Sequence, residues 1–159
     1  MINKNKLPLR TCVGIILLNK ENKIFVGKRI DNQVGNYWQM PQGGVDVNEN
    51  YFQAAKRELQ EEPSVKSVSL VKELDQWLTY DLPENLLGKI WEGKYRGQKQ
   101  KWFIMKFIGN TEEININTQN PEFLDWKWVN SSDLPKIAVN FKVDVYKKLE
   151  KEITSLKLN

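Results

Sequence analysis

Hydrophobic residues along the chain fall into short continuous runs, which predict strands, separated by polar and turn-forming stretches. Residues 13–18 are rich in Val, Ile and Leu, as in a buried strand, and residues 23–29 alternate well enough for a partner strand. Residues 37–40 predict a short aromatic strand that runs into a turn at residues 41–44. Further strands are predicted at residues 65–71, 76–80, 101–108 and 125–129, with a long irregular loop at residues 83–98.

Two other segments have apolar residues at helical spacing. Residues 51–62 predict a helix with Asn50 as its N-cap, and Pro63 is expected to end it because the residue before a proline resists the α conformation. Residues 140–156 predict a second helix. The order of strands, helix, strands and helix predicts an α/β protein in which helices pack on a mixed sheet.

Composition narrows the possible chemistry. The chain has 159 residues, which suits one domain over residues 1–159 with a polar tail at residues 1–6. It contains no histidine and one cysteine, Cys12. These counts exclude Ser-His-Asp and Cys-His nucleophiles, HExxH zinc sites, intrachain disulfides and Cys-rich zinc sites. Any catalysis must therefore use carboxylates, lysine, tyrosine or a metal held by oxygen.

Hydropathy and net charge indicate where the protein acts in the cell and what kind of partner it can bind. The longest apolar run, residues 13–18, is too short to cross a bilayer, and no signal-type apolar segment follows the start of the chain. We therefore expect a cytoplasmic protein. The net charge of +4 permits an anionic partner without choosing one, and it also suits plain surface charge. From residue 43 to residue 65 acids outnumber bases, so the basic excess lies in the rest of the chain.

Three carboxylates lie on one face of the helix predicted at residues 51–62. Glu58, Glu61 and Glu62 stand at positions i, i+3 and i+4, where like charges cost about 0.2–0.5 kcal/mol per pair. Such a face is either exposed to solvent or binds a cation. Carboxylate and main-chain oxygens are the ligands that Mg²⁺ and Mn²⁺ prefer, so a hard-metal site is one interpretation.

The residues around these carboxylates have a spacing that chance rarely produces. From Gly43 to Glu62 the sequence follows Gly-x5-Glu-x7-Arg-Glu-Leu-x-Glu-Glu. It resembles the Nudix box, Gly-x5-Glu-x7-Arg-Glu-apolar-x-Glu-Glu-x-Gly-apolar, at every fixed position up to Glu62. The chain departs at Ser64, where the box has a glycine that commonly adopts positive φ. Serine there costs about 1 kcal/mol, so we expect the helix to close differently, which affects the direction of Glu62 most.

The resemblance to the Nudix family implies an α/β/α sandwich and hydrolysis of a nucleoside diphosphate linked to another group. It implies Mg²⁺ or Mn²⁺, with more than one ion during turnover, bound by Glu58, Glu61, Glu62 and the Gly43 carbonyl. By position, Arg57 braces the glutamates, Glu49 orients Arg57 or the loop, and Gly44 belongs to the structural motif. The base that activates water is then a carboxylate from the set Glu61, Glu58 and, on a later loop, Glu122.

A second set of matches lies outside the box. Residues 38–44 read Trp-Gln-Met-Pro-Gln-Gly-Gly, which resembles the bacterial RNA pyrophosphohydrolase branch of the family and the plant-type dinucleoside polyphosphate hydrolases. The bacterial branch is the closer likeness, and it implies removal of pyrophosphate from the 5′-triphosphate end of RNA. By position, it implies phosphate or nucleotide contacts for Arg10, Arg29, Tyr80, Gln98, Lys101, Phe141 and Lys142.

Other interpretations of these residues stay open. A dinucleoside polyphosphate such as Ap₄A or Ap₅A would use the same glutamates, and an inactive Nudix module would bind nucleotide or RNA without turnover. The complete set of glutamates argues against the inactive module. Phe141 also suits the core, and Lys101 and Lys142 also suit a solvated surface. For either enzyme we expect a polyphosphate of RNA or of a dinucleotide as partner, and neither DNA nor a membrane.

Overall fold

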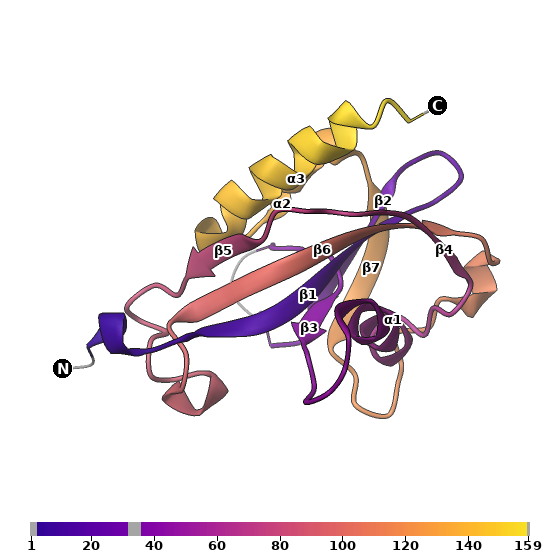
Figure 1. Ribbon diagram of the computed structural model, residues 1–159. Helices are drawn as coiled ribbons and strands as arrows, with labels where there is room; N and C mark the ends of the chain where they lie inside the picture. Colours follow the sequence, from indigo (N-terminus) through magenta and orange to yellow (C-terminus); the bar gives the residue numbers. More distant parts are fainter. Residues whose placement is uncertain (1–2, 32–35, 159) are drawn as a thin grey trace.

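A seven-stranded mixed sheet forms the centre of the structure, a computed structural model that describes residues 3–31 and 36–158 (Figure 1). The strands are β1 (Leu9–Leu18), β2 (Ile24–Arg29), β3 (Gln42–Gly44), β4 (Val68–Glu73), β5 (Leu78–Asp81), β6 (Gly97–Phe107) and β7 (Phe123–Val129). They lie in the order β4-β6-β1-β2-β7, with β3 paired to β1 and β5 paired to β6. Strands β1 and β6 are parallel, and the other pairs are antiparallel.

Helices cover both faces of this sheet (Figure 1). Helix α1 (Tyr51–Glu61) packs on one face, over a buried cluster that includes Ile15. Helix α3 (Val143–Ser155) and the short α2 (Leu134–Ile137) pack on the other, over a cluster that includes Ile16. The two clusters are separate because successive side chains of a strand point to opposite faces. The result is the predicted α/β/α sandwich. Within the described residues, no helix is long and apolar enough to cross a membrane.

Before α1, the sequence predicted a strand where the structure has none and a turn where the structure has a strand. The strand predicted at residues 37–40 is wrong, because within it only Gln39 forms a bridge in the described structure. The turn predicted at residues 41–44 is also wrong, since most of it is β3, paired antiparallel to β1. Its glycines, which are common turn residues, serve here to let Glu58 approach the backbone at Gly43.

Other boundaries differ for identifiable reasons. Strand β6 starts at Gly97, whereas the prediction began at Lys101. Its first residues are polar, so they gave no hydrophobic signal for a strand. Helix α3 starts at Val143, and α2 was missed because four residues are too few for a periodic pattern. Helix α1 stops before Pro63 as predicted, and Asn50 caps it by accepting a 2.7 Å hydrogen bond from the Gln53 amide. Short 3₁₀ helices span Lys4–Lys6, Trp91–Gly93, Thr111–Glu113, Ser131–Asp133 and Asn140–Lys142.

The backbone after α1 keeps a left-handed residue at Ser64. Its φ is 65°, so the expectation that the helix closes differently because of the missing glycine is wrong. The Ser64 hydroxyl donates a 2.7 Å hydrogen bond to the carbonyl of Asn115, and the Val65 amide donates to the carbonyl of Leu59 at 2.8 Å. The local bond at the helix end and the long-range bond to Asn115 together hold a serine in a conformation that favours glycine.

Candidate active site

Glu58 and Arg10 both lie close against the backbone of β3, at its two glycines. Strand β3 is hydrogen-bonded to β1, and α1 packs against both strands. A Cβ at Gly43 would overlap the carboxyl group of Glu58, and a Cβ at Gly44 would lie 2.5 Å from an Arg10 guanidinium nitrogen. The two glycines are therefore required for the close approach of Glu58 from α1 and Arg10 from β1.

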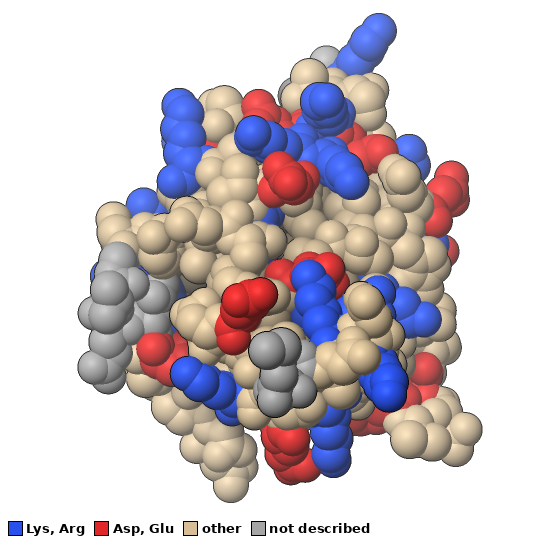
Figure 2. Space-filling view, turned by 90° about the vertical axis from the view of Figure 1, so that its left-hand side faces the viewer, with Lys and Arg blue, Asp and Glu red and all other residues tan. Residues whose placement is uncertain are grey.

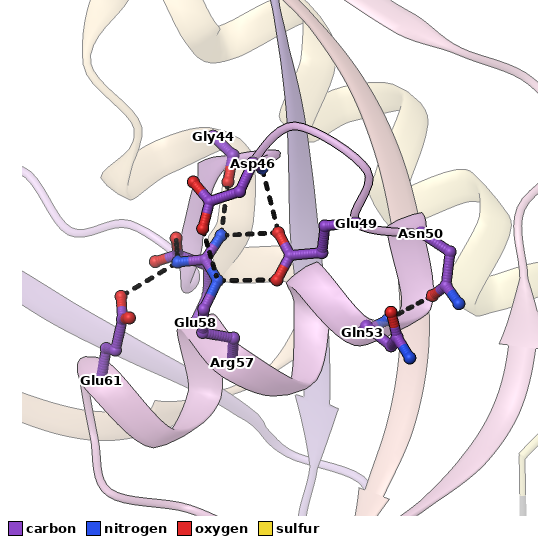
Figure 3. A network of polar contacts seen from close by, with 8 residues as sticks. All are labelled: Gly44, Asp46, Glu49, Asn50, Gln53, Arg57, Glu58 and Glu61. Carbon is purple, nitrogen blue, oxygen red and sulfur yellow. Dashed lines mark hydrogen bonds and ion pairs between the residues drawn. The ribbon is translucent and has the colours of Figure 1, made fainter.

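Arg57 is the centre of a polar network that joins the loop to the helix (Figure 3). Its Nε and Nη2 donate to the two carboxylate oxygens of Glu49 at 2.9 and 3.0 Å, and Nη2 also donates to the carbonyl of Gly44 at 2.8 Å. Its Nη1 donates to Glu58 at 2.9 Å and to Glu61 at 3.1 Å. One guanidinium thus fixes the loop and two of the glutamates by charge-assisted hydrogen bonds.

The three glutamates of the box have different surroundings. Glu58 and Glu62 are buried, with 6% and 1% of their surface exposed, whereas the Glu61 side chain is 55% exposed. Burial raises the pKa of Glu58 to about 7. Burial and the charges of Glu122 and Glu58 raise the pKa of Glu62 well above its ordinary value. Burial also raises the pKa of Glu122, which lies just before β7. Four carboxyl groups therefore meet in one place.

The chemistry of this acidic cluster fits a divalent cation. Both carboxylate oxygens of Glu62 are buried, and neither has a hydrogen-bond partner in the described structure. A buried carboxyl group of this kind either stays protonated, as its raised pKa indicates, or is compensated by a positive charge when it ionises. Across residues 3–31 and 36–158, no three acidic or cysteine side chains are already arranged to hold a metal ion. The glutamates fit a divalent cation by donor type and by the buried carboxyl group of Glu62.

A cavity of about 880 Å³ opens beside Glu58 and Glu61. Figure 2 shows one side of the molecule, on which acidic and basic side chains are mixed around a central depression. Acids and bases that face one cavity suit a ligand that carries phosphates together with bound cations. The cavity wall also contains most of the other expected residues, namely Arg10, Arg29, Gly43, Gly44, Tyr80, Gln98, Glu122, Phe141 and Lys142. Glu49, Arg57 and Glu62 lie outside this wall.

Two cationic side chains in the cavity wall, Arg29 and Lys142, have different partners. Arg29 forms a two-point ion pair with Asp31, at 2.7 and 2.6 Å. Lys142 is buried, and its Nζ lies 3.4 Å from the side-chain oxygen of Gln39. Burial, followed by the positive charge of Arg29, lowers the pKa of Lys142 to about 8. An anion in the cavity would stabilise the charged form of this lysine.

Aromatic rings form another part of the wall. The rings of Tyr80 and Phe141 lie 5.5 Å apart, and burial raises the pKa of Tyr80 above its ordinary value. The Arg10 guanidinium lies 5.6 Å from the ring centre of Trp91, a cation–π distance. The sequence analysis assigned no function to Trp91. Its one signal was an aromatic side chain in a long loop, away from any periodic pattern.

The side chains of Gln39 and Gln42 also line the cavity without having been predicted as site residues. Both belong to the segment 38–44, which the sequence analysis used only as a family match. The Gln42 oxygen accepts a 3.1 Å hydrogen bond from Gln100, which also donates to Gln98 at 2.8 Å. These hydrogen bonds fix Gln98 in the cavity wall.

Lys101 is the expected substrate residue that lies outside this cavity. Gln98 and Gln100 are buried on the α3 side of β6, so the odd-numbered Lys101 points to the opposite face. Its Nζ donates to the main-chain carbonyl of Asp75 at 3.3 Å. The expected contact between Lys101 and the terminal nucleotides is therefore not supported by its position.

Comparison with known proteins gives consistent matches over almost the whole chain. The NUDIX domain family matches residues 8–149. An RNA pyrophosphohydrolase of Pelagibacter ubique is 56% identical over 154 residues, covering 97% of this chain and 97% of that protein. An RNA pyrophosphohydrolase of Wolbachia pipientis is 49% identical over 157 residues, covering 98% and 95%.

Solved structures show the same fold at lower identity. The E. coli dihydroneopterin triphosphate pyrophosphohydrolase superposes with a TM-score of 0.67 at 16% identity, covering 92% of this chain and 99% of that one. A C. elegans Ap4A hydrolase superposes with a TM-score of 0.65 at 20% identity, with the same coverage. At these identities the structures support the fold of the chain and carry no argument about its substrate.

Proposed function

The chain belongs to the Nudix family, and on that premise we propose that it is an RNA pyrophosphohydrolase, which converts the 5′-triphosphate end of RNA into a 5′-monophosphate. The observation that carries the proposal is that Glu58 and Glu61 line the same cavity as Arg10, Arg29 and Lys142. The near full-length relatives with this name support the same substrate class. Because transcripts are the substrate, we also propose that the protein acts in the cytoplasm.

The cations of the cavity bind the phosphate chain. Arg10 and Arg29 present planar guanidinium groups, which suit two-point contact with phosphate oxygens. Lys142 adds a buried ammonium group whose charge is stabilised once an anion lies beside it. Asp31 holds Arg29 in place and leaves part of its guanidinium for the substrate.

The acids of the cavity hold Mg²⁺ or Mn²⁺. Glu58 and Glu61 line the cavity and supply carboxylate oxygens, and Glu62 lies buried behind them. Glu62 and the Gly43 carbonyl are the further ligands in this proposal. Such a cation, when bound, neutralises phosphate oxygens and lowers the pKa of an attacking water. Arg57 holds Glu58 and Glu61 near the cavity when they are not engaged as ligands.

Proton transfer from the attacking water must use a carboxylate, because the chain has no histidine. We assign this role to Glu61, whose side chain is exposed and faces the cavity. Glu58, which is buried, and Glu122, which is exposed, also line the cavity and are the alternatives for this role. Water then supplies the new oxygen on phosphorus, and pyrophosphate leaves as the product.

Product analysis tests this function. The protein is incubated with Mg²⁺ and RNA labelled at the γ-phosphate, and the released phosphate species are separated. We expect pyrophosphate and 5′-monophosphate RNA. The variant Glu61→Gln should lose several orders of magnitude in rate, whereas Glu112→Gln, an exposed acid outside the cavity, should retain the wild-type rate. Wild-type turnover in Glu61→Gln would contradict the mechanism.

A further inference from the structure

A cluster of two lysines and two aromatic rings lies outside the cavity, and we call Tyr51, Trp77, Lys99 and Lys101 the Trp77 patch. The edge of one ring faces the other, with 5.1 Å between the ring centres of Tyr51 and Trp77. The ammonium groups of Lys99 and Lys101 lie 5.6 and 5.8 Å from the centre of the Trp77 ring. The patch therefore joins the start of α1, the segment before β5 and the first half of β6.

The register of β6 places this patch behind the wall of the cavity. Lys99 lies directly opposite Thr79 of β5, and its neighbour Gln98 lies opposite Tyr80. Because side chains alternate along both strands, Gln98 and Tyr80 face the cavity while Lys99 and Thr79 face away from it. In the described sheet β5 pairs only with β6, so its other edge has no strand partner. The cavity wall and the patch therefore lie on opposite faces of the same strand pair, at neighbouring residues.

The two lysines of the patch carry charge that the described protein does not neutralise. Neither Lys99 nor Lys101 forms an ion pair with any acid in residues 3–31 and 36–158. The Trp77 ring keeps both ammonium groups on one side of the strand through cation–π contact. Two neighbouring unpaired cations beside an aromatic surface have the charge and shape that suit a single-stranded nucleic acid backbone.

We propose that the Trp77 patch binds the body of single-stranded RNA downstream of the 5′ end, which rests on the RNA pyrophosphohydrolase activity proposed above. Lys99 and Lys101 each contact one phosphate, and Trp77 positions the two ammonium groups. The contact is with the backbone, so it carries no sequence preference. Its effect grows with the length of the RNA, because an end of one or two nucleotides fills only the cavity.

A salt titration tests the inference. The probe is a fluorescent single-stranded RNA of about twenty nucleotides with a 5′-hydroxyl end, which has no triphosphate for the cavity. We expect the double variant Lys99→Gln, Lys101→Gln to bind it about fivefold more weakly than wild type. The slope of log Kd against log salt should fall by about 1.4, because each phosphate contact to a single strand contributes about 0.7.

The matched control is the double variant Lys147→Gln, Lys148→Gln, which removes the same charge from the exposed face of α3. It should keep the wild-type slope. Equal affinities and equal salt slopes for the patch variant and this control would overturn the inference. Release of pyrophosphate from a triphosphorylated dinucleotide, measured in parallel on the wild type, tests the proposed function separately, because that substrate does not reach the patch.

Discussion

Arg57 and Glu49 form a two-point ion pair, with Nε to Oε2 at 2.9 Å and Nη2 to Oε1 at 3.0 Å. The same Glu49 accepts the amide of Asp46 at 3.0 Å, so the pair ties the loop before α1 to the helix itself. The remaining nitrogen of Arg57 holds Glu58 and Glu61. Glu49 therefore acts on the reacting groups through Arg57, as a positioning residue.

Replacing Glu49 should reduce turnover more than substrate binding. In Glu49→Gln the two-point pair is lost, and Arg57 is free to bind the cavity glutamates in other orientations. Loss of a residue that orients metal-binding groups typically costs about 10–100-fold in activity or metal affinity. We expect a lower kcat, an almost unchanged KM for RNA and a higher Mg²⁺ requirement. A higher KM at unchanged kcat would contradict this role, and Glu112→Gln serves as the control.

Lys142 predicts how activity depends on pH. Its pKa is lowered to about 8, so it loses its charge above that pH in the free protein. We expect kcat/KM for triphosphorylated RNA to fall as pH rises through about 8. Lys142→Arg keeps the charge to much higher pH and should move this fall upward. An identical alkaline limb in the two proteins would show that Lys142 does not bind phosphate.

The same lysine predicts how stability depends on pH. Because the folded pKa is below the unfolded value, the unfolded state binds more protons between about pH 8 and pH 10, and stability from this group rises with pH over that window. Lys142→Met lacks the penalty for a buried charge. Its melting temperature should exceed that of wild type most at pH 8 and below, and the difference should shrink by pH 10. A difference that is constant with pH would contradict the burial of a charged lysine.

Ser64 combines a strained backbone with a compensating hydrogen bond. Ser64→Ala removes only the bond to Asn115, which is worth about 0.5–1.5 kcal/mol. Ser64→Gly removes the bond and also relieves the left-handed strain, by about 1 kcal/mol. We therefore expect Ser64→Gly to be the more stable of the two by about that amount in urea unfolding. Equal stabilities would show that φ at this residue costs little.

Phe141 should contribute to affinity for the nucleotide next to the phosphates. Its ring lines the cavity and rests on Tyr80. Stacking of one base on an aromatic side chain is worth about 1–3 kcal/mol. In steady-state kinetics, Phe141→Ala should raise KM for RNA, and Phe141→Tyr should keep the wild-type value. If KM of Phe141→Ala is unchanged while its melting temperature falls, the ring has a packing role only.

Local chemistry explains which features the sequence revealed. Asn50 and Pro63 define α1 because a cap and a helix breaker act within a few residues. The spacing of Glu58, Glu61 and Glu62 identified the acidic cluster, because one helix turn brings residues three or four apart onto the same face. The mixed sheet with packed helices followed from apolar runs and helical spacing, and the sandwich followed from the resemblance to the Nudix family.

Features that depend on tertiary contacts escaped prediction. At Ser64 the left-handed backbone is supported by a hydrogen bond to distant Asn115, besides the local bond from Val65 to Leu59. The position of Lys101 depends on the register of β6, whose polar start looked like loop. Trp91 reaches the cavity because its loop folds back over Arg10, which no local pattern encodes.

The most direct test of the central claim is a competition between substrates in one tube. Wild-type protein, Mg²⁺ and equal concentrations of triphosphorylated RNA, Ap₄A and Ap₅A are mixed, and the initial rates give the ratios of kcat/KM. The account predicts pyrophosphate and 5′-monophosphate RNA as the dominant products. Preferred cleavage of the dinucleotides, with no pyrophosphate from RNA, would contradict it.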